Sequence, residues 1–230
     1  VGAGLVQIYT ASENRLALQE LLPEAIISCY DSYDDSQLSH LLDWADVVCI
    51  GCGLGMGQIS EKILKNVLKN VSCPCVIDAD GLNLLNRNIE LLNQCCAPVI
   101  LTPHMKEMSR LTGWSIDTIM EDRFQALDQI IKQSGPDTKS SIICVLKDSR
   151  TVVAQTNRQR FVNLAGNNSM AKGGSGDVLA GTIAGLLAQH MAPFEATTVG
   201  VFLHACGGDE AKKSKGSYSV LARDLIQGMA

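Results

Sequence analysis

Residues 167–181 read N-N-S-M-A-K-G-G-S-G-D-V-L-A-G, and no other stretch indicates more about this chain. Gly173, Gly174 and Gly176 can adopt backbone angles that are closed to other residues, so their amides can approach an anion without interference from side chains. The apolar run that follows predicts a helix, whose N-terminus carries a partial positive charge. The sequence therefore predicts a phosphate-binding turn that leads into a helix.

Asp177 follows these glycines at the start of the expected helix. A bound phosphate would repel its charge, so we interpret Asp177 as a proton acceptor beside the transferred group, that is, as the catalytic base. An ordinary acid at a helix start is the alternative, and residue types alone leave both open. The order of residues fits neither a P-loop, which needs lysine after its last glycine, nor a G-x-G-x-x-G dinucleotide site.

The order G-G-S-G-D at a helix start resembles the anion hole of ribokinase-like small-molecule kinases. The whole string is similar to that of the ADP/ATP-dependent NAD(P)H-hydrate dehydratases, which are related to the C-terminal half of bifunctional NAD(P)H-hydrate repair proteins. The resemblance implies one ribokinase-like domain over residues 1–230, a three-layer α/β/α fold with a mainly parallel central sheet. Five more segments resemble this family in the expected order: 2–6, 50–55, 76–83, 101–108 and 201–204.

Strand and helix patterns alternate along the chain, which is typical of a parallel sheet covered by helices. No linker or repeat divides the chain, so we expect a single domain. The expected strands are 45–50, 75–78, 98–101, 142–146, 152–154 and 160–162, the last two in a hairpin. The expected helices are 59–70, 82–92, 105–111 and 117–133, followed by three more at the end of the chain.

Composition and charge narrow the class of protein. The chain has 230 residues, of which 46% are hydrophobic and 19% charged, which suits one α/β domain with a large core. Its net charge of −5 argues against nucleic acid or an anionic membrane as the main partner. No apolar stretch reaches the roughly 20 residues of a membrane-spanning helix. We expect a cytoplasmic enzyme.

Nine cysteines suggest other chemistry, and Cys49 and Cys52 have the spacing of a redox or metal-binding pair. The run that Cys49 ends has the pattern of a buried strand, and no histidine stands at zinc-finger spacing. We therefore expect free, buried thiols in a reducing cytoplasm, with zinc or disulfide chemistry as the alternative.

The chain begins at Val1 and reaches the segment 2–6 at once. In the resembled family, a strand and a long helix precede this segment, so the resemblance implies an N-terminal truncation. The missing strand would leave a sheet edge unpaired, and part of the family's hydrate-binding wall would be absent. Restoring that segment is expected to raise thermal stability and hydrate affinity.

The resemblance implies a role for each residue of the glycine turn. Asp177 would take the proton from the substrate hydroxyl, while the amides of Gly174, Ser175 and Gly176 would hold the transferred phosphoryl group. The substrate would be the S epimer of NADHX or NADPHX, the hydrated forms of NADH and NADPH. Phosphorylation of the ring hydroxyl and loss of phosphate would restore NAD(P)H, which is a metabolite-repair reaction.

The nucleotide is expected between this turn and residues 147–151, K-D-S-R-T. These match the position of the family's adenylate-contacting K-G-x-x-T turn, except that Asp148 replaces glycine; a charged surface hairpin is the alternative. The resemblance favours ADP over ATP as phosphoryl donor, with Mg²⁺. The predicted nucleotide-binding residues are Lys147, Asp148, Ser149, Arg150, Thr151, Asn167, Lys172, Gly173 and Gly176.

His104 follows a proline just past the end of an expected strand, where open α/β sheets place ligands. The resemblance makes His104 a contact to the NAD(P)H hydrate and Gly53 a point where the hydrate passes close to the backbone. Glu107 would help to hold Mg²⁺ or water, or would cap the helix that starts there, and both readings stay open. Cys52 stands where the family usually has proline.

Three other polar residues, Asp78, Asp80 and Asn83, lie at a strand end and could face the cleft, although Asp80 could instead cap a helix. His204 lies in an apolar helix and is expected to be a packed core histidine.

Two other functions stay open at this stage. One is a kinase of the same fold that phosphorylates a metabolite alcohol, because the G-S-G-D site does not name the acceptor. The other is a non-catalytic fragment that binds adenine nucleotides. The resembled family tends to form tetramers, so a homo-oligomer is expected.

Overall fold

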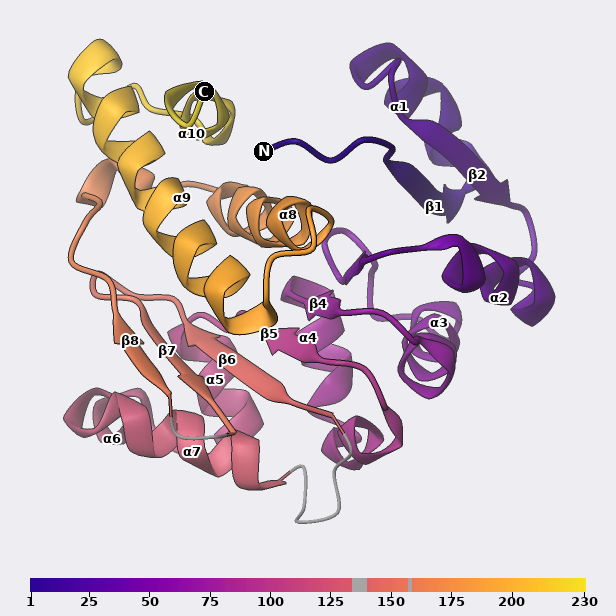
Figure 1. The fold of residues 1–230 in the computed structure, drawn as a ribbon, viewed down its shortest axis with the longest axis horizontal. Coiled ribbons are helices and arrows are strands. Elements are labelled where there is room, and N and C mark those ends of the chain that lie inside the picture. Colours follow the sequence, from indigo (N-terminus) through magenta and orange to yellow (C-terminus); the bar gives the residue numbers. More distant parts are fainter. Residues whose placement is uncertain (134–139, 157–158) are drawn as a thin grey trace.

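The computed structural model describes residues 1–133, 140–156 and 159–230. Its main sheet has six strands in the order β3-β4-β5-β6-β7-β8 (Figure 1). The first four are parallel, and β7 and β8 continue the sheet as an antiparallel hairpin. The strands are β3 (Val48–Ile50), β4 (Cys75–Ile77), β5 (Val99–Leu101), β6 (Ile142–Leu146), β7 (Val152–Gln155) and β8 (Arg160–Val162).

Strands β4, β5 and β6 are buried on both faces, and their successive residues pack into two different cores. Ile77, Leu101 and Cys144 belong to the first core, with apolar side chains of the helices on one side of the sheet. Val76 and Ile100 belong to the second core, with those of the helices on the other side. This alternation positions helices on both sides of the sheet.

The helices form the two outer layers (Figure 1). On one side lie α8 (Ser175–Leu187) and α9 (Pro193–Lys215), with α10 (Ala222–Gly228) packed against both. On the other side lie α3 (Gln58–Asn70), α4 (Ala79–Leu85), α5 (Met105–Thr112), α6 (Ile116–Glu121) and α7 (Arg123–Gln133). The predicted three-layer α/β/α architecture is thus present.

Two predicted helices differ from those observed. The helix expected at 82–92 starts earlier, as α4, and a separate 3₁₀ helix η2 (Ile89–Gln94) follows it. The helix expected at 117–133 is divided into α6 and α7. Asp122 has extended backbone angles there, and its Oδ1 accepts a hydrogen bond from the Gln125 amide at 2.9 Å. Local side-chain capping therefore ends one helix and starts the next.

The first 44 residues form a smaller unit beside α3. It contains β1 (Gln7–Ala11), α1 (Arg15–Leu21), β2 (Ile26–Tyr30) and α2 (Asp35–Trp44), and β1 and β2 form a parallel pair. In the part of the chain that the structure describes, neither strand pairs with the main sheet. Leu38 and Leu42 of α2 join the first core, whereas Leu16 and Leu21 of α1 are exposed.

All nine cysteines are free thiols, but the expectation that they are buried holds for only three of them, while three are half-buried and three are exposed. Cys49, Cys52 and Cys96 are exposed. Cys49 lies on β3, an edge strand of the main sheet, where alternation directs it away from the core that buries Ile50. Among the described residues, no helix is long and apolar enough to span a membrane.

Candidate active site

The carboxyl ends of the parallel strands bring the predicted site residues to one edge of the sheet. Asp78 directly follows β4, and Lys147 directly follows β6. His104 lies shortly after β5 and forms an isolated parallel bridge with Lys147, whose amide donates to the Pro103 carbonyl at 2.8 Å. Three polar side chains are thus presented side by side.

Asp78 and Lys147 form a buried ion pair. The distance from Lys147 Nζ to Asp78 Oδ1 is 2.6 Å, and the side chains are 17% and 1% exposed, respectively. A charge as buried as that of Asp78 requires compensation, which Lys147 provides. The pair also fixes the Lys147 ammonium group at the edge of the sheet.

The glycine turn lies against this ion pair. Gly174 has φ +84°, which glycine adopts readily, and it precedes α8 without a side-chain cap. The first-turn amides of Gly176 and Asp177 have no intrahelical acceptor. A Cβ on Gly176 would lie 3.1 Å from Lys147 Nζ and 3.4 Å from Asp78 Oδ2. Glycine at this position lets the positive helix terminus meet the ion pair.

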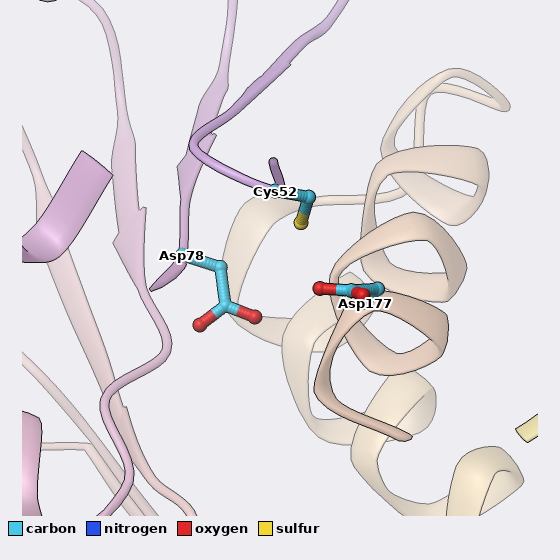
Figure 2. A group of neighbouring side chains, drawn as sticks. All are labelled: Cys52, Asp78 and Asp177. Atoms are coloured by element: carbon cyan, nitrogen blue, oxygen red, sulfur yellow. The ribbon is translucent and has the colours of Figure 1, made fainter. Parts of the chain in front are cut away.

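Asp177 points from the first turn of α8 toward the strand ends (Figure 2). Its carboxylate, that of Asp78 and the Cys52 thiol have atoms within 4.8 Å of one another. Asp177 is exposed, as a group that receives a substrate proton must be. A hydrogen bond with the Cys49 thiol, together with burial and a hydrogen bond to Asp177, raises the pKa of Cys52.

The loop after β3 is fixed against the start of α4. Gly51 has φ +119°, and a Cβ there would lie 1.9 Å from the Asp78 carbonyl oxygen, so only glycine fits. Asp80 Oδ2 accepts a hydrogen bond from the Gly55 amide at 2.8 Å. Gly53 has φ +67° and open space beside it. Asp80 thus holds the loop, and Asn83 accepts from Arg110 at 2.7 Å.

His104 and Glu107 form a reciprocal cap at the start of α5. His104 Nδ1 accepts hydrogen bonds from the amides of Lys106 and Glu107, and Glu107 Oε2 accepts from the His104 amide at 2.9 Å. The capping reading of Glu107 is therefore confirmed, while its binding of Mg²⁺ stays a prediction. Burial raises the pKa of Glu107 and, with the Lys147 charge, lowers that of His104. Nothing in the residue pattern indicated a histidine cap.

The turn 147–151 is held by an ion pair that the sequence did not indicate. Asp148 accepts from Arg123 on α7, with distances of 2.8 Å from Nη2 and 3.2 Å from Nε. This ion pair occupies one carboxylate oxygen, and Thr151 Oγ1 donates to the Asp148 carbonyl at 3.2 Å. Ser149 and Arg150 are exposed. Nucleotide contacts of this turn stay a prediction.

Asn167 is positioned by a residue that sequence reasoning missed. Asp209 on α9 accepts from Asn167 Nδ2 at 2.7 Å and from the Gly166 amide at 3.0 Å. Asn167 Oδ1 in turn caps the 3₁₀ helix η3 (Asn168–Met170) through the Ser169 amide. Lys172 is exposed and donates to the Tyr218 carbonyl at 3.4 Å, and Gly173 has open space around its Cα.

Ser175 is held by a histidine of α9. Its Oγ lies 3.3 Å from Nε2 of His204, which is 8% exposed. The expected packed histidine is confirmed, but its hydrogen bond to the glycine turn was not anticipated. Burial lowers the pKa of His204 to about 4, so the ring is neutral at pH 7.

The model of a protein family described as NAD(P)H-hydrate dehydratase matches residues 1–230 of this chain. The chain belongs to the NAD(P)H-hydrate dehydratase family. This confirms the family resemblance that the sequence indicated. Similarity to solved structures likewise confirms the ribokinase-like fold with a central, mainly parallel sheet.

Two curated members of the NAD(P)H-hydrate dehydratase family and one solved structure illustrate the similarity. The bifunctional NAD(P)H-hydrate repair enzyme Nnr of Escherichia coli is 38% identical over 98% of this chain and 41% of its own length. The ADP-dependent (S)-NAD(P)H-hydrate dehydratase of Neisseria meningitidis is 36% identical over 91% of this chain and 69% of its own. The Bacillus subtilis ADP/ATP-dependent NAD(P)H-hydrate dehydratase, co-crystallised with ATP and Mg²⁺, has a TM-score of 0.80 and 27% identity over 99% of this chain and 80% of its own.

The length of the chain differs from that of its bifunctional relatives. It spans less than half of the curated repair enzymes that it matches.

Proposed function

We propose that this domain dehydrates the S epimer of NAD(P)H hydrate to NAD(P)H at the expense of ADP or ATP. The observation that carries the proposal is the position of Asp177. It lies on the first turn of α8, directly after the glycine turn and opposite the Asp78–Lys147 pair. A base, an anion-binding helix terminus and a fixed cation thus surround one point, as phosphoryl transfer requires.

In the first step, the hydroxyl of the hydrated ring attacks the terminal phosphorus of the nucleotide. Asp177 accepts the hydroxyl proton as the new P–O bond forms, and the bond to the donor breaks to release AMP from ADP, or ADP from ATP. The amides of Gly174 and Gly176 and the Lys147 ammonium group stabilise the transferred charge, whereas the Ser175 amide donates to the Lys172 carbonyl at 3.2 Å in this structure. An ionised carboxylate suits this role, because the proton is accepted late.

In the second step, the C–O bond to phosphate breaks. The lone pair of the ring nitrogen supplies the electrons and forms an iminium, and loss of a proton from the adjacent carbon restores the dihydronicotinamide ring. The products are NAD(P)H, phosphate and the shortened nucleotide. His104 and Gly53, which flank the same edge of the sheet, are our proposed contacts to the hydrate.

The residues present fit a nucleotide with Mg²⁺. Lys147, the backbone of the turn 147–151, Asn167, Lys172 and Gly173 are the proposed nucleotide contacts. The Asp78 carboxylate supplies the oxygen ligands that Mg²⁺ prefers, and Oδ1 alone is used by Lys147. Mg²⁺ would neutralise phosphate charge there, whereas the Glu107 carboxylate is already engaged in the cap of α5.

The test is a reaction in which purified protein, the hydrate and ADP or ATP are combined and followed in two ways. We expect return of the dihydronicotinamide absorbance, together with stoichiometric phosphate and AMP or ADP. A phosphorylated alcohol without phosphate release would instead identify a metabolite kinase. Nucleotide binding without any turnover would contradict catalysis by this chain. A homo-oligomer, with the tetramer as the expected state, is a separate proposal that light scattering after gel filtration tests.

A further inference from the structure

The side chains of Cys52, Asp78 and Asp177 converge on one point (Figure 2). They come from three different elements: the loop after β3, the end of β4 and the first turn of α8. One ligand atom of each, the Cys52 Sγ and a carboxylate oxygen of each aspartate, lies within 4.8 Å of the other two. Around a tetrahedral zinc ion the ligand atoms are about 3.5 Å apart, so small side-chain adjustments would suffice.

We propose that Cys52, Asp78 and Asp177 form a binding site for a thiophilic divalent cation such as Zn²⁺, and that its occupation blocks phosphoryl transfer. Thiolate ligands select zinc and similar ions, whereas Mg²⁺ prefers a set of oxygen ligands. The cysteine therefore gives this group a preference for thiophilic ions over the Mg²⁺ that accompanies a nucleotide, although both ions would use the Asp78 carboxylate. The binding step stands by itself, and the inhibition rests on the proposed function.

The charges of the group match a divalent cation. With the ion bound, two carboxylates and a thiolate would carry three negative charges, of which the Lys147 ammonium group, bound to Asp78 Oδ1, compensates one. A divalent cation would neutralise the remainder. Because Asp78 is 1% exposed, such neutralisation is worth more than it would be at the surface.

Each ligand has a free atom for the ion. Asp78 keeps its Oδ1 bond to Lys147, while Oδ2 lies on the side of Gly176, whose missing Cβ leaves room there. The Cys52 thiol transfers its proton to solvent as the sulfur–metal bond forms, so binding releases one proton. Three protein ligands leave a fourth tetrahedral position for water or a phosphate oxygen. Asp177 would then be unable to accept the substrate proton.

The direct test is titration of the whole chain with Co²⁺, an optical substitute for Zn²⁺, and with Zn²⁺ in a calorimeter. The variants are Cys52→Ser and, as matched control, Cys96→Ser, which removes an exposed thiol near the opposite end of β5. We expect wild type and the control to show a thiolate-to-cobalt absorption band that Cys52→Ser lacks. Affinity for Zn²⁺ should fall by at least about tenfold in Cys52→Ser, the effect that loss of an outer-shell partner already has.

An unchanged band and affinity in Cys52→Ser would overturn the site, as would the absence of any thiolate band in wild type. Asp177→Asn should also weaken Zn²⁺ binding, which distinguishes this group from a site made by other cysteines. In the dehydration assay, Zn²⁺ should inhibit wild type and Cys96→Ser but spare Cys52→Ser. Zinc binding without inhibition would overturn the second half of the proposal. If neither wild type nor any variant dehydrates the hydrate, only the proposed function is contradicted. The cobalt spectrum still shows whether the metal binds at Cys52.

Discussion

Asp78 and Lys147 are 69 positions apart in the chain, yet their side chains form a 2.6 Å ion pair. The pair joins the end of β4 to the end of β6 across the intervening strand β5. The ion pair therefore links two strands of the sheet. It also forms the surface against which the N-terminus of α8 packs.

The first prediction concerns this pair. Lys147→Met should lower the free energy of unfolding by about 3 kcal/mol, because it leaves the buried Asp78 charge without compensation. Lys213→Met is the control, since the Lys213–Glu210 pair is exposed to solvent and should contribute little to stability. Urea denaturation of both variants measures the difference. Equal losses would mean that burial of Asp78 carries no special cost.

The second prediction concerns Asp177. Asp177→Asn should lower turnover by about 10² to 10⁴, because the amide cannot accept the hydroxyl proton, and should leave nucleotide affinity unchanged. Asp117→Asn, which changes an exposed acid in the first turn of α6, is the matched control. Steady-state kinetics and calorimetry with ADP separate the two effects. Near-native turnover in Asp177→Asn would remove it from the role of base.

The third prediction concerns Gly176. Gly176→Val should weaken ADP binding, because its side chain would enter the space beside Lys147 Nζ and Asp78 Oδ2. Gly181→Ala is the control, since Gly181 is an exposed residue inside α8 at which a Cβ meets no atom within 4 Å. Calorimetry with ADP or AMP gives the affinities, and circular dichroism verifies the fold. Unchanged affinity in a folded Gly176→Val protein would mean that the phosphate lies elsewhere.

The fourth prediction is a pH dependence of stability. His204 has a folded pKa of about 4, below the ordinary value of 6.5, so the unfolded chain binds the proton more readily. The contribution of His204 to the free energy of unfolding is fully present above pH 6.5 and is lost progressively as the pH falls toward 4. The total loss is about 3 kcal/mol.

Urea denaturation at several pH values between 7 and 4 tests this. His204→Gln should show a smaller loss of stability over this range than wild type, and His40→Gln, a change of an exposed histidine, should show the same loss as wild type. Parallel curves for all three proteins would contradict the assignment to His204.

The sequence predicted the main sheet and most of the helices beside it, which depend on local patterns, but none of the strands and helices in residues 7–44. Short apolar runs located all six strands of the main sheet, and the glycines and Asp177 located the start of α8. The break at Asp122 was missed because it depends on a cap to Gln125, and either residue would also fit inside a helix. Residue types in this segment favour neither outcome.

The supports of the candidate site were harder to predict, because they come from residues far apart in the chain. Asp209 is 42 positions from Asn167, and Arg123 is 25 from Asp148. The position of Asp209 in a long helix does not indicate which loop its side chain will bind. The His104 cap was missed for another reason, since histidine is not among the usual N-cap residues.

Successive residues of β4, β5 and β6 alternate between two cores. This alternation restricts insertions and deletions within these strands. Inserting or deleting a single codon within one of these strands would exchange the residues of both cores at once, since a shift by one position turns every side chain to the opposite face. Substitutions of similar volume can accumulate there one at a time, whereas insertions and deletions cannot. Length differences among descendants of this gene are therefore expected in the connecting segments.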